Sequence, residues 1–190
     1  MSFYSITDLS GYNAAKEHLL QILSRTTIPP IVQGNLARRP DGSVRYVTQR
    51  GDVIGLIGRT LNFGSGMRRF KGYGEFVTNE RYPELWNALQ DFSKYALPPD
   101  FEWQTLTLNK DVKAKKHIDT FNVGESYIVG FGEYTGGKLR TYINEVDYVA
   151  NDIKDRPLTF NGALIPHETE EFTGERYTLI FYKQEKSKTK

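Results

Sequence analysis

The sequence lacks cysteine altogether, and this absence excludes several kinds of site. Disulfide bonds, iron–sulfur clusters and zinc sites built on thiolates all require cysteine side chains. The sequence also lacks an apolar run long enough to cross a bilayer, and its start, MSFYSITDLS, has no basic segment followed by an apolar one. We therefore expect an intracellular protein, in the cytoplasm or the nucleus, with no export signal and no association with a membrane.

Net charge is also scarce, at only +2 over 190 residues. The composition, 38% hydrophobic and 13% aromatic, suffices for one hydrophobic core. We expect a monomer with a single domain over residues 1–190. Within it we distinguish a helical, basic and glycine-rich part (1–100), a core of strands (101–183) and a basic tail (184–190).

The small net charge hides a segregation of charge along the chain. The segment Leu36–Lys71 is strongly basic, with only Asp41 and Asp52 as acidic residues, and Lys110–Lys116 and Lys183–Lys190 are basic as well. The basic residues of the first segment are Arg38, Arg39, Arg45, Arg50, Arg59, Arg68, Arg69 and Lys71. Such segregation predicts a basic face for a polyanion such as DNA, because lysine and arginine neutralise phosphates. The alternative is a solvated surface.

The glycine-rich stretch GSGMRRFKGYG closes this basic segment. It lacks the GK[ST] ending of a phosphate-binding loop, which argues against a nucleotide site. Its Arg68, Arg69 and Lys71 interleave with aromatic residues, a combination typical of proteins that hold a nucleic-acid strand by charge and stacking. We predict that these three basic side chains contact the substrate; the alternative is an ordinary loop packed on the fold.

Two helices and one hairpin are predicted before residue 100. Asn13–Ser24 and Pro83–Leu97 place apolar residues on one side at helical spacing, and the second begins with proline and ends before a Pro-Pro pair. Ile31–Ile57 alternates apolar and polar residues around the turn Pro40–Ser43, which predicts a β-hairpin. Gly51–Gly74 contains seven glycines, so we expect loops there more than regular structure.

From Phe101 onward the apolar period changes to two, which predicts strands separated by glycine, aspartate and asparagine turns. The expected strands are Trp103–Leu108, Ser126–Gly132, Lys138–Ile143, Leu158–Phe160, Ala163–Ile165 and Glu175–Lys183. Two supporting N-terminal helices followed by a run of strands predict an α+β protein with a β-sandwich or jelly-roll core.

The chemical centre of the sequence is His117-Ile118-Asp119. Residues two apart on an extended backbone point to the same side, so this imidazole and this carboxylate can bind one metal ion. Only two other histidines are available as a third ligand. His18 lies in a predicted amphipathic helix, whereas His167 precedes a run that favours β-structure, so His167 is the better candidate. Two histidines and one carboxylate are the ligands of the facial triad that binds non-heme Fe(II).

The order His117, Asp119, His167 and then Arg176 resembles the 2-oxoglutarate- and Fe(II)-dependent dioxygenases. The resemblance covers residues 101–182, and each motif is flanked by strand-like sequence. It implies a double-stranded β-helix that carries the three metal ligands. It also implies an oxygenase that uses Fe(II), 2-oxoglutarate and O2, with ascorbate as a candidate reductant.

Three further residues are expected to serve the co-substrate. The resemblance implies that Arg176 pairs with the distal carboxylate of 2-oxoglutarate, a geometry that guanidinium suits better than ammonium. Thr178 lies two residues further, on the same face of the predicted strand, and can add a hydroxyl hydrogen bond. Asn109, on the strand before the metal-binding segment, is a further candidate contact.

Three motifs suggest a narrower resemblance: HIDTFN from His117, GFGEYTGGKL from Gly130 and FTGERYTLIF from Phe172. They are similar to the branch that contains the ten-eleven-translocation methylcytosine oxidases and the base-J thymine hydroxylases. This branch implies hydroxylation of the methyl group of 5-methylcytosine or thymine in DNA, with the base flipped out of the duplex and contacted by Asn122. Thr178 stands where the branch has serine, and the cysteine-rich zinc region of the animal enzymes is absent.

Two other functions remain open from the sequence. The chain could be a 2-oxoglutarate-dependent hydroxylase of a protein side chain or a small metabolite, in which case the basic segment would form a lid. It could also be a binding module without turnover. The intact set of His117, Asp119, His167 and Arg176 argues against the second, because a decayed site should have lost at least one of them.

Overall fold

A large antiparallel sheet forms the centre of the fold in the computed structural model, which describes residues 1–30, 35–38, 44–47, 57–68 and 71–185. Its seven strands lie in the order β1-β11-β7-β14-β6-β4-β5. Their bounds are β1 Ser2–Phe3, β4 Ile57–Arg68, β5 Gly72–Glu75, β6 Thr105–Lys113, β7 Ser126–Phe131, β11 Leu158–Phe160 and β14 Tyr177–Tyr182. β14, which begins directly after Arg176 and carries Thr178, is central and pairs with β6 on one side and β7 on the other.

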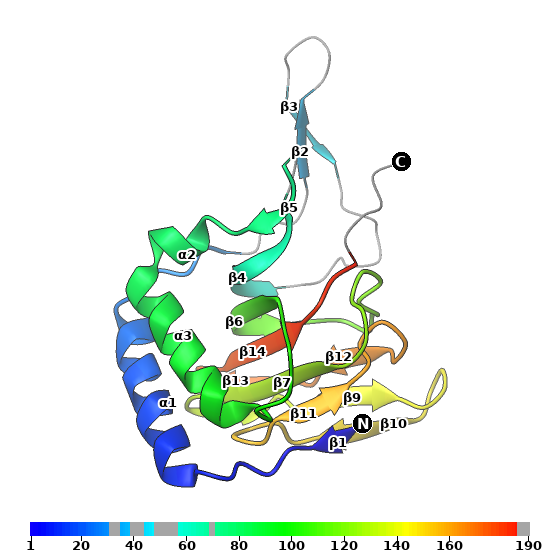
Figure 1. Cartoon of the computed structure of the whole chain (residues 1–190). Coiled ribbons are helices and arrows are strands. Elements are labelled where there is room, and N and C mark those ends of the chain that lie inside the picture. Colours follow the sequence, from blue (N-terminus) through cyan, green and yellow to red (C-terminus); the bar gives the residue numbers. More distant parts are fainter. Residues whose placement is uncertain (31–34, 39–43, 48–56, 69–70, 186–190) are drawn as a thin grey trace.

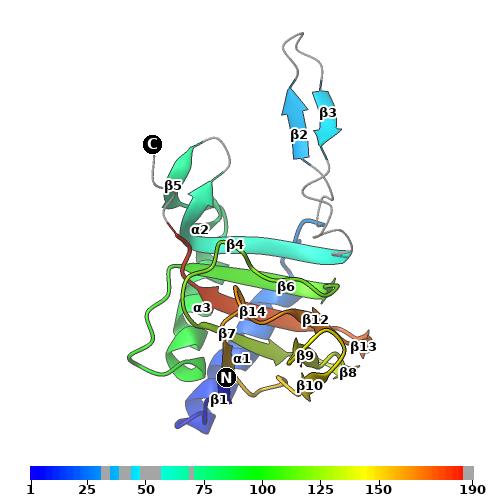
Figure 2. The same cartoon turned by 90° about the vertical axis from the view of Figure 1, so that its right-hand side faces the viewer.

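Smaller groups of strands complete the β-structure. One sheet has the order β10-β9-β12, a second pairs β13 with β8, and a hairpin pairs β2 with β3. The bounds are β2 Asn35–Arg38, β3 Val44–Val47, β8 Tyr134–Gly136, β9 Leu139–Tyr142, β10 Tyr148–Asn151, β12 His167–Thr169 and β13 Phe172–Gly174. The helices cover one face of the large sheet and β9, β10 and β12 lie on the other side, whereas β2 and β3 stand away from the rest (Figures 1 and 2). Two facing layers of antiparallel strands agree with the predicted jelly-roll architecture.

The helices lie close to the predicted positions but not as an N-terminal pair. α1 spans Leu9–Ser24 and is capped by the Asp8 side chain, which accepts a hydrogen bond from the Gly11 N–H over 2.8 Å. α3 spans Pro83–Ala96 with proline in its first turn, and a short α2 spans Thr78–Arg81. Only α1 is N-terminal, because α2 and α3 follow β5 and precede β6. The prediction of two N-terminal helices is therefore not confirmed. None of these helices is both long and apolar enough to span a membrane.

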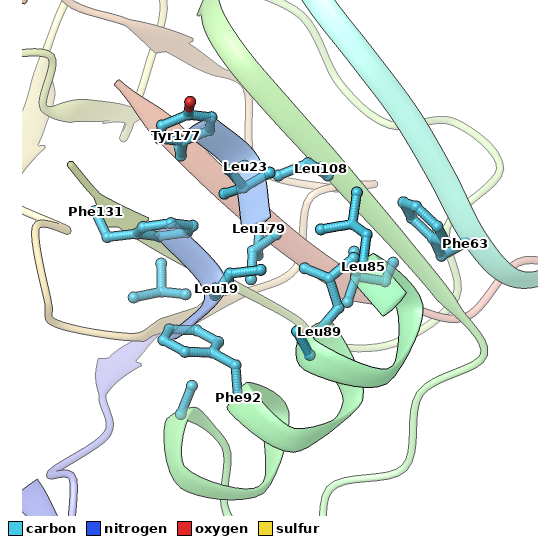
Figure 3. Close-up of a cluster of buried hydrophobic side chains, with 14 of the residues drawn as sticks. Leu19, Leu23, Phe63, Leu85, Leu89, Phe92, Leu108, Phe131, Tyr177 and Leu179 are labelled. Carbon is cyan, nitrogen blue, oxygen red and sulfur yellow. The ribbon is translucent and has the colours of Figure 1, made fainter. Parts of the chain in front are cut away.

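The hydrophobic core lies between the helices and one face of the large sheet (Figure 3). Alternate residues of the strands supply one half of it, and the apolar stripes of α1 and α3 supply the other. The core residues include Leu19, Leu23, Phe63, Leu85, Leu89, Phe92, Leu108, Phe131, Tyr177 and Leu179, each at most 2% exposed. Burying such a side chain contributes about 1.5–3 kcal/mol. Since the period of a strand is two, the residues between them point to the opposite face, toward β9 and β12.

The strand β4 corrects the prediction of loops over Gly51–Gly74. Residues 57–68 form the longest strand of the large sheet and 72–75 form its partner β5. The alternation Thr60-Leu61-Asn62-Phe63 is strand-like, but the surrounding glycines obscured it. Gly64 has φ +82°, and a Cβ there would lie 2.2 Å from the Gln104 carbonyl oxygen, so this glycine allows a close approach of two backbones rather than marking a loop.

The remaining strand predictions were mostly confirmed. The predicted strands at 126–132, 138–143, 158–160 and 175–183 match β7, β9, β11 and β14 within two residues at each end, and the one at 103–108 is the first half of β6. β2 and β3 confirm the hairpin, although its predicted turn, Pro40–Ser43, lies outside the described residues. The strand at Ala163–Ile165 was wrong, because the N–H groups of Leu164 and Ile165 donate to the Asn161 carbonyl in a turn. β12 begins after it, at His167.

Candidate metal and co-substrate site

His117 and His167 lie side by side although they are far apart in the sequence. Their backbones form an antiparallel bridge in which each N–H donates to the other residue's carbonyl, over 3.0 Å from His117 and 2.9 Å from His167. His117 follows the end of β6, and His167 is the first residue of β12. The two imidazole rings have centroids 4.3 Å apart. The bridge therefore sets the separation of the rings through the backbone itself.

Both imidazoles present the same nitrogen to the site. Nδ1 of His117 lies 2.6 Å from the Lys115 carbonyl oxygen, and Nδ1 of His167 lies 2.8 Å from the Ile165 carbonyl oxygen. Because a carbonyl only accepts, each Nδ1 carries the hydrogen and each Nε2 is left with a lone pair. The Nε2 atoms lie 3.5 Å (His117) and 3.6 Å (His167) from the Asp119 carboxylate oxygens. One ligand atom from each of the three residues lies within 4.8 Å of the others.

Asp119 is held by the loop that follows it and by the loop before β12. Its N–H donates to the Gly162 carbonyl over 2.8 Å, and its own carbonyl accepts the Asn122 N–H over 2.9 Å. The Asn122 side-chain amide donates to Asp119 Oδ2 over 3.3 Å. A Cβ at position 162 would lie 2.7 Å from the same oxygen, so any larger residue there would push against the carboxylate. In this arrangement the carboxylate faces both imidazoles.

The two imidazoles differ in their electrostatic environment. Burial lowers the pKa of His117, but the adjacent Asp119 carboxylate and the hydrogen bond to the Lys115 carbonyl outweigh burial, and the net pKa is raised. Burial lowers the pKa of His167, and this effect prevails over the attraction of Asp119. His167 is only 6% exposed and packs edge-on against Phe160, with ring centroids 5.0 Å apart. The lowered pKa favours the neutral imidazole, which is the form that binds metals.

Arg176 is a buried cation with unusual partners. It is 2% exposed, and its guanidinium donates to the carbonyl oxygens of Gly137 over 2.9 Å and Val112 over 3.5 Å. No carboxylate in the described part of the chain forms an ion pair with it, and its Nε is buried without a partner. Burial lowers the pKa of this guanidinium. Burying a charge without a counter-ion costs desolvation free energy. A bound anion would offset this cost, so Arg176 is a candidate anion-binding residue.

The imidazoles, the carboxylate and the guanidinium line one cavity of about 810 Å³. Thr178 and Asn109 line it as well and lie opposite each other on β14 and β6. Thr60 follows in the same row on β4, and its hydroxyl donates to Asn109 Oδ1 over 2.8 Å. His18, by contrast, lies on α1 outside the metal-binding group. The structure thus brings together the predicted metal ligands and the predicted co-substrate residues.

The predicted substrate residues are more scattered. Asn122 lines the cavity, but its amide is engaged with Asp119. Arg68 folds back on its own hairpin, where its guanidinium contacts the carbonyl oxygens of Gly72, Glu75 and Lys71. Lys71 is exposed in the turn of that hairpin, and Arg69 lies outside the described residues. Neither Arg68 nor Lys71 lines the cavity.

Comparison with known proteins gives similarity at the level of the fold. No family model and no curated protein matches the sequence. Among solved structures, a Pseudomonas putida prolyl-4-hydroxylase is similar with a TM-score of 0.55 and 11% identity, covering 97% of this chain and 92% of that one. A Trichoplax adhaerens prolyl hydroxylase, in complex with a peptide fragment of hypoxia inducible factor, has a TM-score of 0.51 and 14% identity, covering 95% and 82%. A Burkholderia pseudomallei oxidoreductase of the 2OG-Fe(II) oxygenase family has a TM-score of 0.50 and 12% identity, covering 88% and 77%.

The chain has the fold of the 2-oxoglutarate- and Fe(II)-dependent oxygenases. This agrees with the fold that the resemblance in the sequence implies. Similarity of the fold does not distinguish the branch that oxidises DNA bases from other oxygenases with this fold, such as the prolyl hydroxylases. The narrower resemblance therefore stays a prediction.

Sequence reasoning missed several polar residues of the cavity. Asn62, Thr107, Tyr182 and Gln184 all line it, and none was a candidate. Asn62 and Thr107 alternate with core residues on β4 and β6, so a correct assignment of β4 would have placed Asn62 on the cavity face. Gln184 follows the last strand and carries no signal in the sequence.

Proposed function

We propose that the protein is an Fe(II)- and 2-oxoglutarate-dependent dioxygenase. One observation carries the proposal: a single cavity holds three converging metal-ligand atoms and a buried guanidinium that lacks a carboxylate partner among the described residues. The Nε2 atoms lie 3.5 and 3.6 Å from the Asp119 oxygens, and one ligand atom from each residue lies within 4.8 Å of the others, so the three residues could hold one ion.

The residues of the cavity then have separate tasks. His117, Asp119 and His167 would hold Fe(II), and Arg176 would bind the distal carboxylate of 2-oxoglutarate through two parallel hydrogen bonds. Thr178 can add a hydroxyl bond, and Thr60 orients the amide of Asn109 toward the same end. Bound Fe(II), 2-oxoglutarate and O2 would supply oxidation of a substrate C–H bond to an alcohol, with succinate and CO2 as the other products.

For the substrate, we propose the methyl group of a pyrimidine, 5-methylcytosine or thymine, in DNA. The positive charge of the segment Leu36–Lys71 favours a polyanionic substrate such as DNA. Asn122 lines the cavity and carries an amide that can contact a base. The base would have to leave the duplex to enter the cavity. The competing substrate is a protein side chain, favoured by the similarity in fold to a prolyl hydroxylase whose structure contains a peptide; a small metabolite is the third possibility.

Release of succinate tests the oxygenase and identifies the substrate class. Enzyme, Fe(II), 2-oxoglutarate and O2 are incubated alone, with methylated DNA, and with proline-containing peptides. DNA-stimulated succinate together with hydroxymethylpyrimidine in the digested nucleosides would support the proposal. Stimulation by peptide alone would move the substrate to protein. A protein that binds Fe(II) and 2-oxoglutarate no better than its His167→Ala variant would overturn the oxygenase itself.

A further inference from the structure

The two-stranded ribbon of β8 and β13 leads directly to Arg176, which is the second residue after β13. The register of the ribbon pairs Phe172 with Gly136 and Gly174 with Tyr134. Directly paired residues point to the same side of a ribbon, and so do residues two apart on one strand. These four residues therefore share one face. Because two of them are glycines, the rings of Tyr134 and Phe172 are the only side chains that the paired residues place on it.

Both rings lie close to the Arg176 guanidinium. Its central carbon is 5.5 Å from the centre of the Tyr134 ring and 5.4 Å from the centre of the Phe172 ring. A cation within about 6 Å of an aromatic ring is attracted by the ring's negative face, and the attraction is stronger where water is excluded. Water is largely excluded here, because Arg176 is 2% exposed and Tyr134 is 6% exposed. The rings therefore offset part of the cost of burying this charge.

Two neighbouring residues support this arrangement. Gly137 makes room for the guanidinium, since a Cβ there would lie 2.7 Å from Arg176 Nε and 3.1 Å from the Phe172 Cβ. The Gly137 carbonyl also accepts a hydrogen bond from the guanidinium over 2.9 Å. The Lys154 ammonium, 4.9 Å from the centre of the Tyr134 ring, donates to the Tyr134 carbonyl over 3.1 Å and ties this end of β8 to the segment after β10. The ribbon and its surroundings thus fix both the rings and the cation.

The carboxylates near Arg176 in the described part of the chain are engaged elsewhere. Asp111 Oδ1 accepts the Arg176 backbone N–H over 2.8 Å and forms no ion pair with the guanidinium, and Glu171 and Glu175 each pair with a lysine. A carboxylate bound to the guanidinium would occupy the donors that an incoming anion needs. An aromatic face attracts the charge without accepting its N–H groups in ordinary hydrogen bonds. The rings therefore stabilise the cation and leave its remaining donors for a ligand.

We propose that Tyr134 and Phe172 are positioning residues, which hold the Arg176 guanidinium by their ring faces and so set the preference of the site for a 2-oxo acid with a second carboxylate. The inference rests on the proposed oxygenase function, in which Arg176 binds the distal carboxylate of 2-oxoglutarate. It adds the residues that orient this cation. Neither ring lines the cavity, so both act through Arg176 and not by contact with the co-substrate.

Two 2-oxo acids separate an effect on Arg176 from general damage to the site. 2-Oxopentanoate has the carbon chain of 2-oxoglutarate with a methyl group in place of the second carboxylate, so only 2-oxoglutarate can pair with Arg176. The full chain is loaded with Mn2+ in place of Fe(II), and affinities for Mn2+ and for each acid are measured by calorimetry. The variants are Tyr134→Leu, Phe172→Leu and the conservative Tyr134→Phe. Tyr148→Leu is the matched control, because the Tyr148 ring lies 4.4 Å from the guanidinium carbon of Arg140 and does not line the cavity.

The parent protein should bind 2-oxoglutarate at least about tenfold more tightly than 2-oxopentanoate, the effect of one hydrogen bond to a charged group. Tyr134→Leu and Phe172→Leu should each weaken 2-oxoglutarate binding by about three- to thirtyfold, with unchanged affinities for Mn2+ and 2-oxopentanoate. Tyr134→Phe should keep the affinity of the parent, because it retains the ring and removes a hydroxyl that has no hydrogen-bond partner among the described residues. Tyr148→Leu should match the parent for all three ligands.

Other outcomes would contradict the inference. Unchanged 2-oxoglutarate affinity in both leucine variants would overturn it, and so would an equal loss of affinity for the two acids, which would indicate general damage. A loss in Tyr134→Phe as large as that in Tyr134→Leu would assign the effect to the hydroxyl and not to the ring. If one leucine variant fails to fold, the other decides, because Tyr134 and Phe172 lie on different strands. A parent that binds Mn2+ but neither acid would overturn the proposed function itself.

Discussion

Asp111 and Arg176 are joined by two reciprocal hydrogen bonds. The Arg176 N–H donates to Asp111 Oδ1 over 2.8 Å, and the Asp111 N–H donates to the Arg176 carbonyl over 2.7 Å. Asp111 adopts a left-handed conformation with φ 53°, at the point where the register between β4 and β6 shifts. Gly58 faces it, and a Cβ there would lie 2.6 Å from the Asp111 carbonyl oxygen. This irregularity in β6 fixes the backbone from which the Arg176 side chain enters the cavity.

Replacing Asp111 by alanine should therefore impair co-substrate binding, whereas asparagine should be tolerated. Asp111→Asn keeps an acceptor oxygen and tolerates positive φ, so stability and 2-oxoglutarate affinity should stay close to those of the parent. Asp111→Ala should lower the free energy of unfolding by about 2 kcal/mol, from the left-handed backbone and one lost hydrogen bond, and should weaken 2-oxoglutarate binding. Chemical denaturation and calorimetry measure the two effects. Equal affinities in the alanine and asparagine variants would show that Asp111 does not position Arg176.

The metal ligands should be separable from the stability of the fold. His117→Ala, Asp119→Ala and His167→Ala should each abolish metal-dependent turnover while the fold persists, because the core between the helices and the sheet carries stability. Asp119→Glu should fail as well, since an extra methylene displaces the carboxylate in a site that tolerates about 0.5 Å. Asp147→Glu, at an exposed turn, is the matched control. Full activity in any of the three alanine variants would remove that residue from the site.

Gly162 should matter to the metal although it is not a ligand. In Gly162→Ala the new methyl group would lie 2.7 Å from Asp119 Oδ2 and must displace the carboxylate. Metal affinity should fall by about 10- to 100-fold, the range found for residues that orient ligands. Gly124→Ala is a suitable control, since no atom lies within 4 Å of a Cβ there, although its φ of +73° adds backbone strain. Unchanged metal affinity in Gly162→Ala would mean that Asp119 is free to move.

Arg176→Lys should raise the concentration of 2-oxoglutarate required for turnover much more than it alters affinity for the substrate. An ammonium is a point charge and cannot donate the two parallel hydrogen bonds of a guanidinium. Arg140→Lys is the matched control, because Arg140 already pairs with Glu168 and Glu170 away from the cavity. An unchanged 2-oxoglutarate dependence would place the co-substrate elsewhere or make it a different acid.

The basic hairpin between β4 and β5 tests DNA binding independently of the cavity. Replacing Arg68, Arg69 and Lys71 together by alanine should weaken DNA binding regardless of sequence and reduce the slope of its salt dependence by up to about three. Conversion of 2-oxoglutarate to succinate in the absence of DNA should persist. The control replaces Arg25, Arg81 and Lys94, which lie on the helical side of the fold. The same slope in both triple variants would show that this hairpin makes no phosphate contacts.

The sequence by itself determined the parts that depend on local pattern. Period two after residue 101 predicted most strands, the apolar stripe of Pro83–Leu97 predicted α3, and the order of two histidines, an aspartate and an arginine predicted the residues that meet in the cavity. These signals lie within short windows, because the side-chain period and the turn residues are local properties. The same local logic failed at β4, where glycines that allow close approach of Gln104 resembled those of a loop.

Only the tertiary structure decided which partners each side chain has. The reciprocal bridge of His117 and His167, the hydrogen bonds of the Arg176 guanidinium to the Gly137 and Val112 carbonyls, and the hydrogen bonds of Thr107 with Asn62 and Tyr182 all join residues distant in sequence. Asn122 shows the difference most clearly: the sequence predicted a base contact, and in the fold its NH2 group donates to Asp119. Such contacts follow from the register of paired strands, which no single segment encodes.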